Sequence, residues 1–351
     1  MSGVHQVLAG SAPRDAITHH ALEARRVLRD MGLRSEILVA DDRIHPALRG
    51  ELHPHTAWDS LARPGDVAIL HYSIASPAFE WVLARAERTA LQYHNVTPAA
   101  LLWRDAPLVA LECALGRRAL GELVGRVGAV AADSEFNAAE LRELGFGEAA
   151  VIGVMRAPLG SALRRPRPAG SPARLLFVGR GAPNKAQHDL VLALAALGQA
   201  GVEAELWLVG TWEGFEPYEA RCLDLARRVG VEDRVVLTGS LSESELPQAY
   251  ADADCFVCLS DHEGFCVPVL EAIEMALPIV AFAAGAVPES VGRAGLLLDE
   301  KPPSLVAEAV VEALGNAGLA ARMAAGRDEQ LARFSHDALA QRLRDFVEPL
   351  V

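Results

Sequence analysis

The residues best suited to chemistry lie between positions 260 and 271, in Ser-Asp-His-Glu-Gly-Phe-Cys-Val-Pro-Val-Leu-Glu. Glu263 falls in the loop after an expected strand, and Glu271 falls just over one turn into the following helix. Both carboxylates can face one ligand across the helix N-terminus, where Gly264 permits close approach and unbonded N–H groups attract anions. A carboxylate accepts hydrogen bonds from paired hydroxyls, as on a ribose or hexose. This spacing alone is equally typical of solvated carboxylates.

A second group surrounds a glycine-bounded turn in Phe-Val-Gly-Arg-Gly-Ala-Pro-Asn-Lys, residues 177–185. Arg180 and Lys185 follow an expected strand and can converge on a diphosphate, the first by a forked contact and the second as a point charge. The P-loop pattern is absent. Each motif alone also fits solvated side chains, but their order and separation are more specific, with a turn at Leu241 between them.

An alternation of strands and helices must position these residues. In the first half, Asp15 caps a helix expected over 16–31, and apolar runs predict short buried strands at 4–9, 36–40, 67–71, 89–93 and 129–132. Residues 160–173 are rich in Pro, Gly, Ser and Arg, which is typical of a linker. The alternation then restarts, with expected strands at 175–178, 205–209, 235–237, 255–259 and 279–282.

This pattern predicts an α/β fold with two doubly wound parallel-sheet domains and a cleft between them. We expect the first domain to comprise residues 1–165 and the second 166–333, with the C-terminal segment 334–351 packed back on the first. Ligands in such sheets bind beyond the carboxyl ends of the strands.

Three stretches between residues 178 and 298 resemble glycosyltransferase family 4, the large retaining family with the GT-B fold of two Rossmann-like domains. They are VGRGAPNKAQHDLVLALAAL, LTGSLSESELPQAYADADCFVCLSDHEGFCVPVLEAIEMALPIVA and GAVPESVGRAGLLL. The resemblance implies that Arg180 and Lys185 hold the donor diphosphate, that Glu263 lies beside the donor sugar and that Glu271 binds the ribose. It assigns further donor contacts to the turn at Leu241 and to the backbone at Gly264, Phe265, Cys266 and Val267.

The resemblance also concerns the first domain, which would bind the acceptor. His94 directly follows an apolar strand, where the family places a histidine near the donor sugar, so we predict it as catalytic with Glu263, and His71 as second choice. Asp15 and Thr18 are candidates for lining the cleft. The chain departs from the family at Cys266, where a small residue such as Gly is usual, and in the stretch GSAPRDAITHH, where many relatives carry Gly-Gly.

The predicted activity is hexosyl transfer from a UDP- or GDP-sugar to a hydroxyl acceptor, with retention, in carbohydrate biosynthesis. A preorganised Arg, Lys and helix N-terminus can absorb the charge of the leaving diphosphate, so we expect neither a metal nor another cofactor. The acceptor is open between a glycan, a lipid-linked and a small molecule. The alternatives are a GT-B-fold sugar-nucleotide epimerase, a glycosyl phosphorylase and, less favoured, a non-catalytic sugar-nucleotide binder.

Composition narrows the remaining classes. Residues 1–165 carry 18 basic and 19 acidic side chains, and the remainder 15 and 27, so neither nucleic acid nor an anionic membrane surface is an expected partner. The five cysteines are scattered, as in a cytoplasmic protein with reduced thiols, and we expect no signal peptide or membrane-spanning run. Asp252-Ala-Asp254 and the pair Cys255 and Cys258 imitate metal motifs, and we interpret both as structural.

Overall fold

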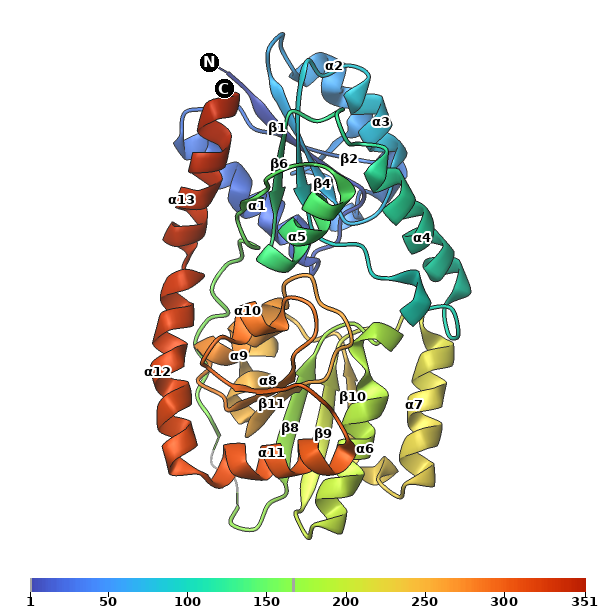
Figure 1. Ribbon diagram of the computed structural model, residues 1–351, viewed down its shortest axis with the longest axis vertical. Helices are drawn as coiled ribbons and strands as arrows, with labels where there is room; N and C mark the ends of the chain where they lie inside the picture. The colour runs from blue at the N-terminus through green and yellow to red at the C-terminus, as the bar shows by residue number, and fades with distance from the viewer. Residues whose placement is uncertain (1, 166–167) are drawn as a thin grey trace. The chain divides into compact units, whose positions relative to one another are not determined.

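The computed structural model describes residues 2–165 and 168–351, and the chain divides by its internal contacts into two compact units (Figure 1). Unit 1 comprises Met1–Val96, Leu111–Ala157 and Phe334–Val351, and unit 2 comprises Thr97–Ala110 and Pro158–Arg333. The sequence predicts the division at 165/166, next to Pro166 and Arg167, which lie outside the described residues.

One difference from the predicted domains is the assignment of residues 97–110 to unit 2. Asp105 in this segment is buried and accepts two hydrogen bonds from the guanidinium of Arg221, at 2.7 and 3.1 Å. A forked pair of this kind is among the stronger polar contacts in proteins. Sequence periodicity carries no signal for such a long-range pair, which explains why the prediction kept this segment with its sequence neighbours.

Within the described residues, unit 1 contains a seven-stranded, wholly parallel sheet in the order β3-β2-β1-β4-β5-β6-β7. Its central strands are buried along most of their length because helices cover both faces of a parallel sheet. The strands are β1 (Val4–Leu8), β2 (Ile37–Val39), β3 (His53–Pro54), β4 (Val67–Tyr72), β5 (Arg88–Tyr93), β6 (Ala129–Ala132) and β7 (Ala150–Val151). The helices are α1 (Ala16–Asp30), α2 (Trp58–Leu61), α3 (Pro77–Leu83), α4 (Pro107–Gly121), α5 (Glu135–Leu144) and α13 (His336–Val347).

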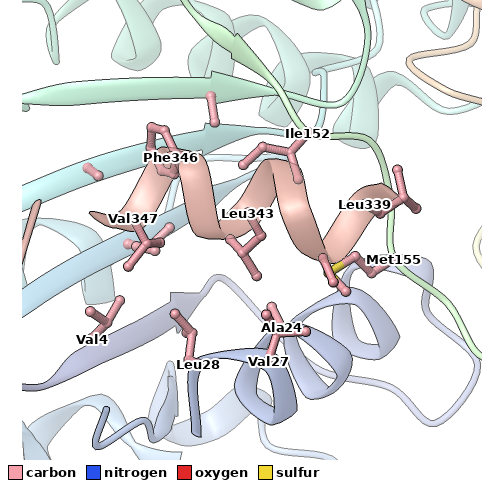
Figure 2. Close-up of a cluster of buried hydrophobic side chains, with 14 of the residues drawn as sticks. Val4, Ala24, Val27, Leu28, Ile152, Met155, Leu339, Leu343, Phe346 and Val347 are labelled. Atoms are coloured by element: carbon pink, nitrogen blue, oxygen red, sulfur yellow. The ribbon is translucent and has the colours of Figure 1, made fainter. Parts of the chain in front are cut away.

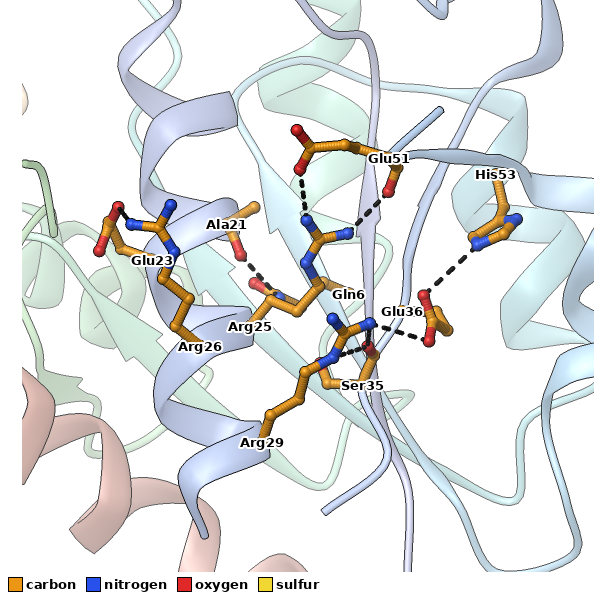
Figure 3. Close-up of polar contacts among 10 residues, drawn as sticks. All are labelled: Gln6, Ala21, Glu23, Arg25, Arg26, Arg29, Ser35, Glu36, Glu51 and His53. Atoms are coloured by element: carbon orange, nitrogen blue, oxygen red, sulfur yellow. Dashed lines mark hydrogen bonds and ion pairs between the residues drawn. The ribbon is translucent and has the colours of Figure 1, made fainter. Parts of the chain in front are cut away.

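Helix α1 starts where the sequence predicts, because the Asp15 carboxylate accepts from the backbone N–H of Thr18 at 2.8 Å and from its hydroxyl at 2.9 Å. Its outer side holds arginines that reach neighbouring segments (Figure 3). Arg29, for example, donates to the carbonyl of Ser35 and to the carboxylate of Glu36. Such contacts fix the orientation of α1, although exposed ion pairs contribute little free energy.

Helix α13 closes the core of unit 1 from the far end of the chain (Figure 2). Leu339, Leu343, Phe346 and Val347 recur at helical spacing on one side and are buried. They pack against a cluster drawn from β1, α1 and the segment after β7: Val4, Ala24, Val27, Leu28, Ile152 and Met155. The last residues of the chain are therefore part of the hydrophobic core of unit 1.

We predict that Leu343→Ala lowers the free energy of unfolding of unit 1 by about 2–5 kcal/mol, because it leaves a cavity in this core. Urea unfolding measures the change, and Gln341→Ala on the exposed side of α13 is the matched control, expected within about 0.5 kcal/mol of the parent. A loss for Leu343→Ala no larger than that of the control would show that α13 does not contribute to the core.

The described part of unit 2 contains a six-stranded parallel sheet in the order β10-β9-β8-β11-β12-β13. Its strands are β8 (Ala173–Val178), β9 (Ala204–Val209), β10 (Val235–Gly239), β11 (Cys255–Cys258), β12 (Ile279–Phe282) and β13 (Leu296–Leu298). Its helices are α6 (Gln187–Gln199), α7 (Glu216–Arg228), α8 (Leu246–Asp252), α9 (Val267–Glu274), α10 (Val287–Val291), α11 (Pro303–Gly315) and α12 (Ala317–Arg333). Two doubly wound parallel sheets confirm the predicted fold class.

A further property of the helices is their capacity to cross a membrane. Among the described residues, no single helix combines the required length and apolar character. The bent pair Pro303–Gly315 and Ala317–Leu350, with 85° between its parts, has sufficient length and apolar composition only when the two parts are taken together.

Candidate active site

The carboxyl end of β8 opens into the loop that holds Arg180 and Lys185. Arg180 is exposed, and its backbone carbonyl accepts from Gln187 at the start of α6 at 2.9 Å. Gly181 lies so close to the indole of Trp212 that a Cβ there would approach it to 2.1 Å. The loop therefore requires glycine at this position. Lys185 ends a 3-10 turn, Pro183–Lys185, just before α6.

Lys185 and Glu263, predicted from separate motifs, meet in the structure. The Lys185 ammonium donates to Glu263 Oε2 at 2.7 Å, and both side chains are largely buried. Burial would lower the pKa of Lys185, but the Glu263 carboxylate, together with the nearby Cys266 and Cys258, outweighs it and raises the pKa above its ordinary value. The lysine therefore stays charged, with its side chain 23% exposed.

The Glu263 loop is fixed by backbone contacts on two sides. Its carbonyl accepts from the N–H of Ala286 at 2.9 Å, and a Cβ on Gly285 would approach that carbonyl oxygen to 2.3 Å. On the other side, the N–H of Asp261 donates to the carbonyl of Asn184, the residue before Lys185, at 2.8 Å. The two predicted motifs are thus joined through their backbones as well as through their side chains.

The second lysine of the chain supports the same loop. Lys301 donates to the carbonyl of Leu259 at 2.9 Å and to the carboxylate of Asp261 at 2.6 Å, and it also pairs with Asp189 of α6 at 2.7 Å. Both lysines therefore act on the loop between β11 and α9. The sequence motifs singled out only Lys185.

Helix α9 presents its N-terminus beside Glu263. Its N-cap, Cys266, has a left-handed backbone with φ 69°. This conformation costs a non-glycine residue roughly 1 kcal/mol, which is a physical reason for a glycine at this position. Gly264, Phe265 and Val267 complete this turn. Farther along α9, Glu271 accepts a hydrogen bond at 2.6 Å from the hydroxyl of Tyr250 in α8, a contact that the sequence did not reveal.

Leu241 lies in the turn between β10 and α8 and is half-buried. The two aspartates of the apparent Asp-x-Asp metal motif have other partners. Asp252 accepts from the backbone of Arg165, and Asp254 accepts from the backbone of Arg174, at 3.2 and 2.7 Å. These aspartates therefore anchor the chain before and at the start of β8, as the structural interpretation expected.

In unit 1, His94 and His71 lie together at the carboxyl ends of β4 and β5. His71 Nδ1 is 2.8 Å from His94 Nε2, and the two rings are stacked with an interplanar angle of 10°. His94 Nδ1 is 2.8 Å from Asp133 Oδ2, and His71 Nε2 is 3.0 Å from Gln6 Oε1. The His94 side chain is only 1% exposed, so both ring nitrogens are engaged inside unit 1.

His20 of α1 completes this network. It receives the N–H of Met155 at Nδ1, at 2.9 Å, so its Nε2 carries the proton and donates to Gln92 Oε1 at 2.9 Å. Gln92 in turn donates to Asp133 Oδ1 at 3.2 Å. Asp133 directly follows β6 as His94 follows β5, which is the sequence signal that could have identified it.

The orientation of Gln6 sets the tautomer of His71. The Gln6 amide nitrogen donates to the carbonyl of Ala21 at 2.9 Å (Figure 3), so its oxygen accepts from His71 Nε2 at 3.0 Å. Burial first, with His94 and His20 nearby, lowers the pKa of His71 well below its usual value, so this ring stays neutral. His71 Nδ1 is then the acceptor for His94 Nε2.

The buried imidazoles predict a pH-dependent stability. Burial first, and the nearby His94 second, lower the pKa of His20 from 6.5 to about 4. Below pH 6.5 His20 binds a proton in the unfolded chain, whereas in the folded chain it does so only near pH 4. The free energy of unfolding therefore decreases as the pH falls, and the complete loss from this group is about 3 kcal/mol. Urea titrations between pH 7.5 and 4.5 should show this loss. His20→Gln should flatten it, and His45→Gln at an exposed position should not; equal slopes in all three would contradict the assignment.

Asp15 and Thr18 bond to each other at the start of α1, and Thr18 is also the acceptor for the backbone N–H of Ala12 at 3.2 Å. These contacts shape the loop after β1. Four of the predicted residues form two pairs, one within each unit: His71 with His94 in unit 1, and Lys185 with Glu263 in unit 2. The hydrogen bonds described above for Arg180 and Glu271 are with Gln187 and Tyr250, outside both pairs, and Leu241 lies in a separate turn.

Comparison with known proteins agrees with this fold. Residues 172–316 match the family model described as glycosyl transferases group 1, in agreement with the resemblance noted in the sequence. The GDP-mannose-dependent alpha-(1-6)-phosphatidylinositol monomannoside mannosyltransferase of Mycobacterium tuberculosis is 34% identical over 195 residues, 53% of this chain and 50% of that protein. A D-inositol 3-phosphate glycosyltransferase of Salinispora arenicola is 33% identical over 46% of this chain and 38% of its own length. The chain thus spans half or less of the curated relatives it matches.

Solved structures extend the likeness to the whole chain. The crystal structure of Anabaena Alr3699/HepE in complex with UDP and glucose has a TM-score of 0.75 and 19% identity, covering 99% of this chain and 100% of that one. The sucrose-phosphate synthase of Thermosynechococcus elongatus has a TM-score of 0.77 and 17% identity, covering 99% of both chains. At this identity the likeness establishes the fold, which is GT-B.

Proposed function

We propose that the protein transfers a hexosyl group from a nucleotide diphosphate sugar to a hydroxyl acceptor. The observation that carries this proposal is the contact of Lys185 with Glu263 at 2.7 Å beside the N-terminus of α9, at the carboxyl edge of the unit 2 sheet. This arrangement offers a cation and a helix N-terminus for phosphate, and a carboxylate for sugar hydroxyls. The family of residues 172–316 supports the same interpretation.

In this proposal, the basic and the acidic residues of unit 2 bind different parts of the donor. Arg180 and Lys185 bind the diphosphate and stabilise the negative charge that it gains as the sugar–phosphate bond breaks. Glu263 positions the sugar and stabilises positive charge at its anomeric carbon. Glu271, oriented by Tyr250, binds the ribose hydroxyls. We propose retention of configuration and no requirement for a metal, since the cations and the helix N-terminus supply the charge that a metal would supply.

For unit 1 we propose acceptor binding, with a revised role for His94. Its imidazole is held between Asp133 and His71 and is nearly inaccessible, so we propose that it positions the backbone after β5 and does not itself contact the sugar. Asn95, the next residue, has a left-handed φ of 72° and donates to Asn137, which indicates a closely specified turn. Loss of His94 would then disturb the acceptor site indirectly.

The names of the relatives indicate which donors and acceptors to test first. The relatives are named for GDP-mannose, phosphatidylinositol mannoside and inositol phosphate, and one structural neighbour is a complex with UDP and glucose. We therefore propose GDP-mannose and UDP-glucose as the first donors, and inositol-bearing glycolipids or polyol phosphates as the first acceptors.

The test is nucleotide release from each donor, with and without acceptor and with EDTA. We expect release that depends on the acceptor and survives EDTA. Product without an acceptor would indicate an epimerase, a requirement for inorganic phosphate without nucleotide would indicate a phosphorylase, and binding without turnover would indicate a non-catalytic binder. Loss of activity in EDTA that a divalent ion restores would contradict the metal-free mechanism.

A further inference from the structure

Two cysteines and the Glu263 carboxylate form a compact cluster that the proposed reaction does not use. Cys258 ends β11, Cys266 caps α9, and a ligand atom from each of the three residues lies within 4.8 Å of the others. The two sulfur atoms are 3.9 Å apart and all three residues are buried. Cys255, which the sequence places with Cys258 in a C-x-x-C pattern, lies outside this cluster.

The separation of the sulfurs fits a bridging cation. Two thiolates at about 2.3 Å from a tetrahedral Zn²⁺ lie about 3.8 Å apart, close to the distance in this cluster. Sulfurs joined in a disulfide are only about 2.05 Å apart, so oxidation would require the two sulfur atoms to approach each other by nearly 2 Å. Metal binding needs little rearrangement of either sulfur.

We propose that Cys258, Cys266 and Glu263 form a binding site for a thiophilic divalent cation, of which Zn²⁺ is the natural representative and Cd²⁺ a useful probe. Thiolate and carboxylate ligands suit both ions, and three protein ligands leave one coordination position open. Both thiols lose their protons on binding, so two protons are released per cation and affinity rises with pH.

The charges balance only when Lys185 is included. Two thiolates and one carboxylate carry three negative charges, which a divalent cation and the Lys185 ammonium neutralise together. Metal binding engages the Glu263 carboxylate, which contacts Lys185 at 2.7 Å and which the proposed function assigns to the donor sugar. The cation therefore competes with donor binding. This consequence rests on the proposed function, whereas the binding site itself does not.

The experiment is a titration of the reduced full-length chain with Cd²⁺, followed by the ultraviolet absorption of the cadmium–thiolate bond. We expect one Cd²⁺ per chain, displaced by Zn²⁺. Cys258→Ala should weaken binding at least about tenfold, and Glu263→Gln should also weaken it. Cys255→Ala, in the same strand and equally buried, is the matched control and should bind as the parent does.

The outcomes separate this site from the proposed activity. Absence of a stoichiometric thiolate band in the parent, or an unchanged band in both Cys258→Ala and Glu263→Gln, would overturn the site. If the site is correct, Zn²⁺ lowers donor affinity in the parent and not in Cys258→Ala. A chain that binds Cd²⁺ but never transfers sugar would refute the activity alone, and an active chain without Cd²⁺ binding would refute the site alone.

Discussion

Lys185→Ala is expected to reduce turnover at least about 100-fold, because the leaving diphosphate loses its nearest cation in a partly buried site where charge stabilisation is worth a few kcal/mol. The variant also leaves the buried Glu263 carboxylate without its 2.7 Å partner. A fall in stability is therefore expected together with the fall in rate, and steady-state kinetics must be paired with thermal unfolding of the same sample.

Two further variants separate these effects. Lys185→Ala combined with Glu263→Gln removes the stranded charge and should recover stability without recovering turnover. Arg228→Ala, an exposed position in α7 of the same unit, should leave both unchanged. Turnover near the parental rate in Lys185→Ala would refute the diphosphate assignment.

Asp133→Asn is expected to lower the free energy of unfolding of unit 1 by about 3–5 kcal/mol, the usual cost of removing one member of a buried charge pair. Asp133 accepts from His94 at 2.8 Å and from Gln92 at 3.2 Å, so the amide would turn a donor toward one of these donors.

Urea unfolding at pH 7.5 measures this change, with Asp30→Asn at the exposed end of α1 as control. Binding of nucleotide diphosphate sugars by unit 2 should survive in Asp133→Asn. Parental stability in Asp133→Asn would show that the hydrogen bonds of Asp133 to His94 and Gln92 do not stabilise unit 1.

The elements of this fold were largely readable from sequence because their signals are local. The predicted strands at 129–132 and 279–282 have the observed bounds, and the cap at Asp15 is the one that forms. The two-residue strands β3 and β7 were missed, since so short a strand has no alternation to detect. The grouping of residues 97–110 with unit 2 depends on a pair 116 residues apart, which no local pattern encodes.

The candidate site likewise contains residues that the sequence could predict and residues that it could not. Lys185 and Glu263 belong to motifs whose order is distinctive, so their meeting could be anticipated. Tyr250 could not, because it acts through a hydrogen bond made by the tertiary fold. The position of Asp133 directly after β6 was a usable signal, but its partner His94 is known only from the fold. The pairing of Cys258 with Cys266 likewise required the turn before α9, whereas the sequence pairs it with Cys255.

We propose that Lys185, with Glu263 and Glu271, binds a nucleotide diphosphate sugar in unit 2. Isothermal titration of the chain with UDP-, GDP- and ADP-sugars measures this binding without needing the acceptor. We predict one saturable site for at least one of these donors, weakened at least about tenfold in both Lys185→Ala and Glu271→Gln. Equal affinity in the parent and both variants, or no binding of any of the three donors, would contradict it.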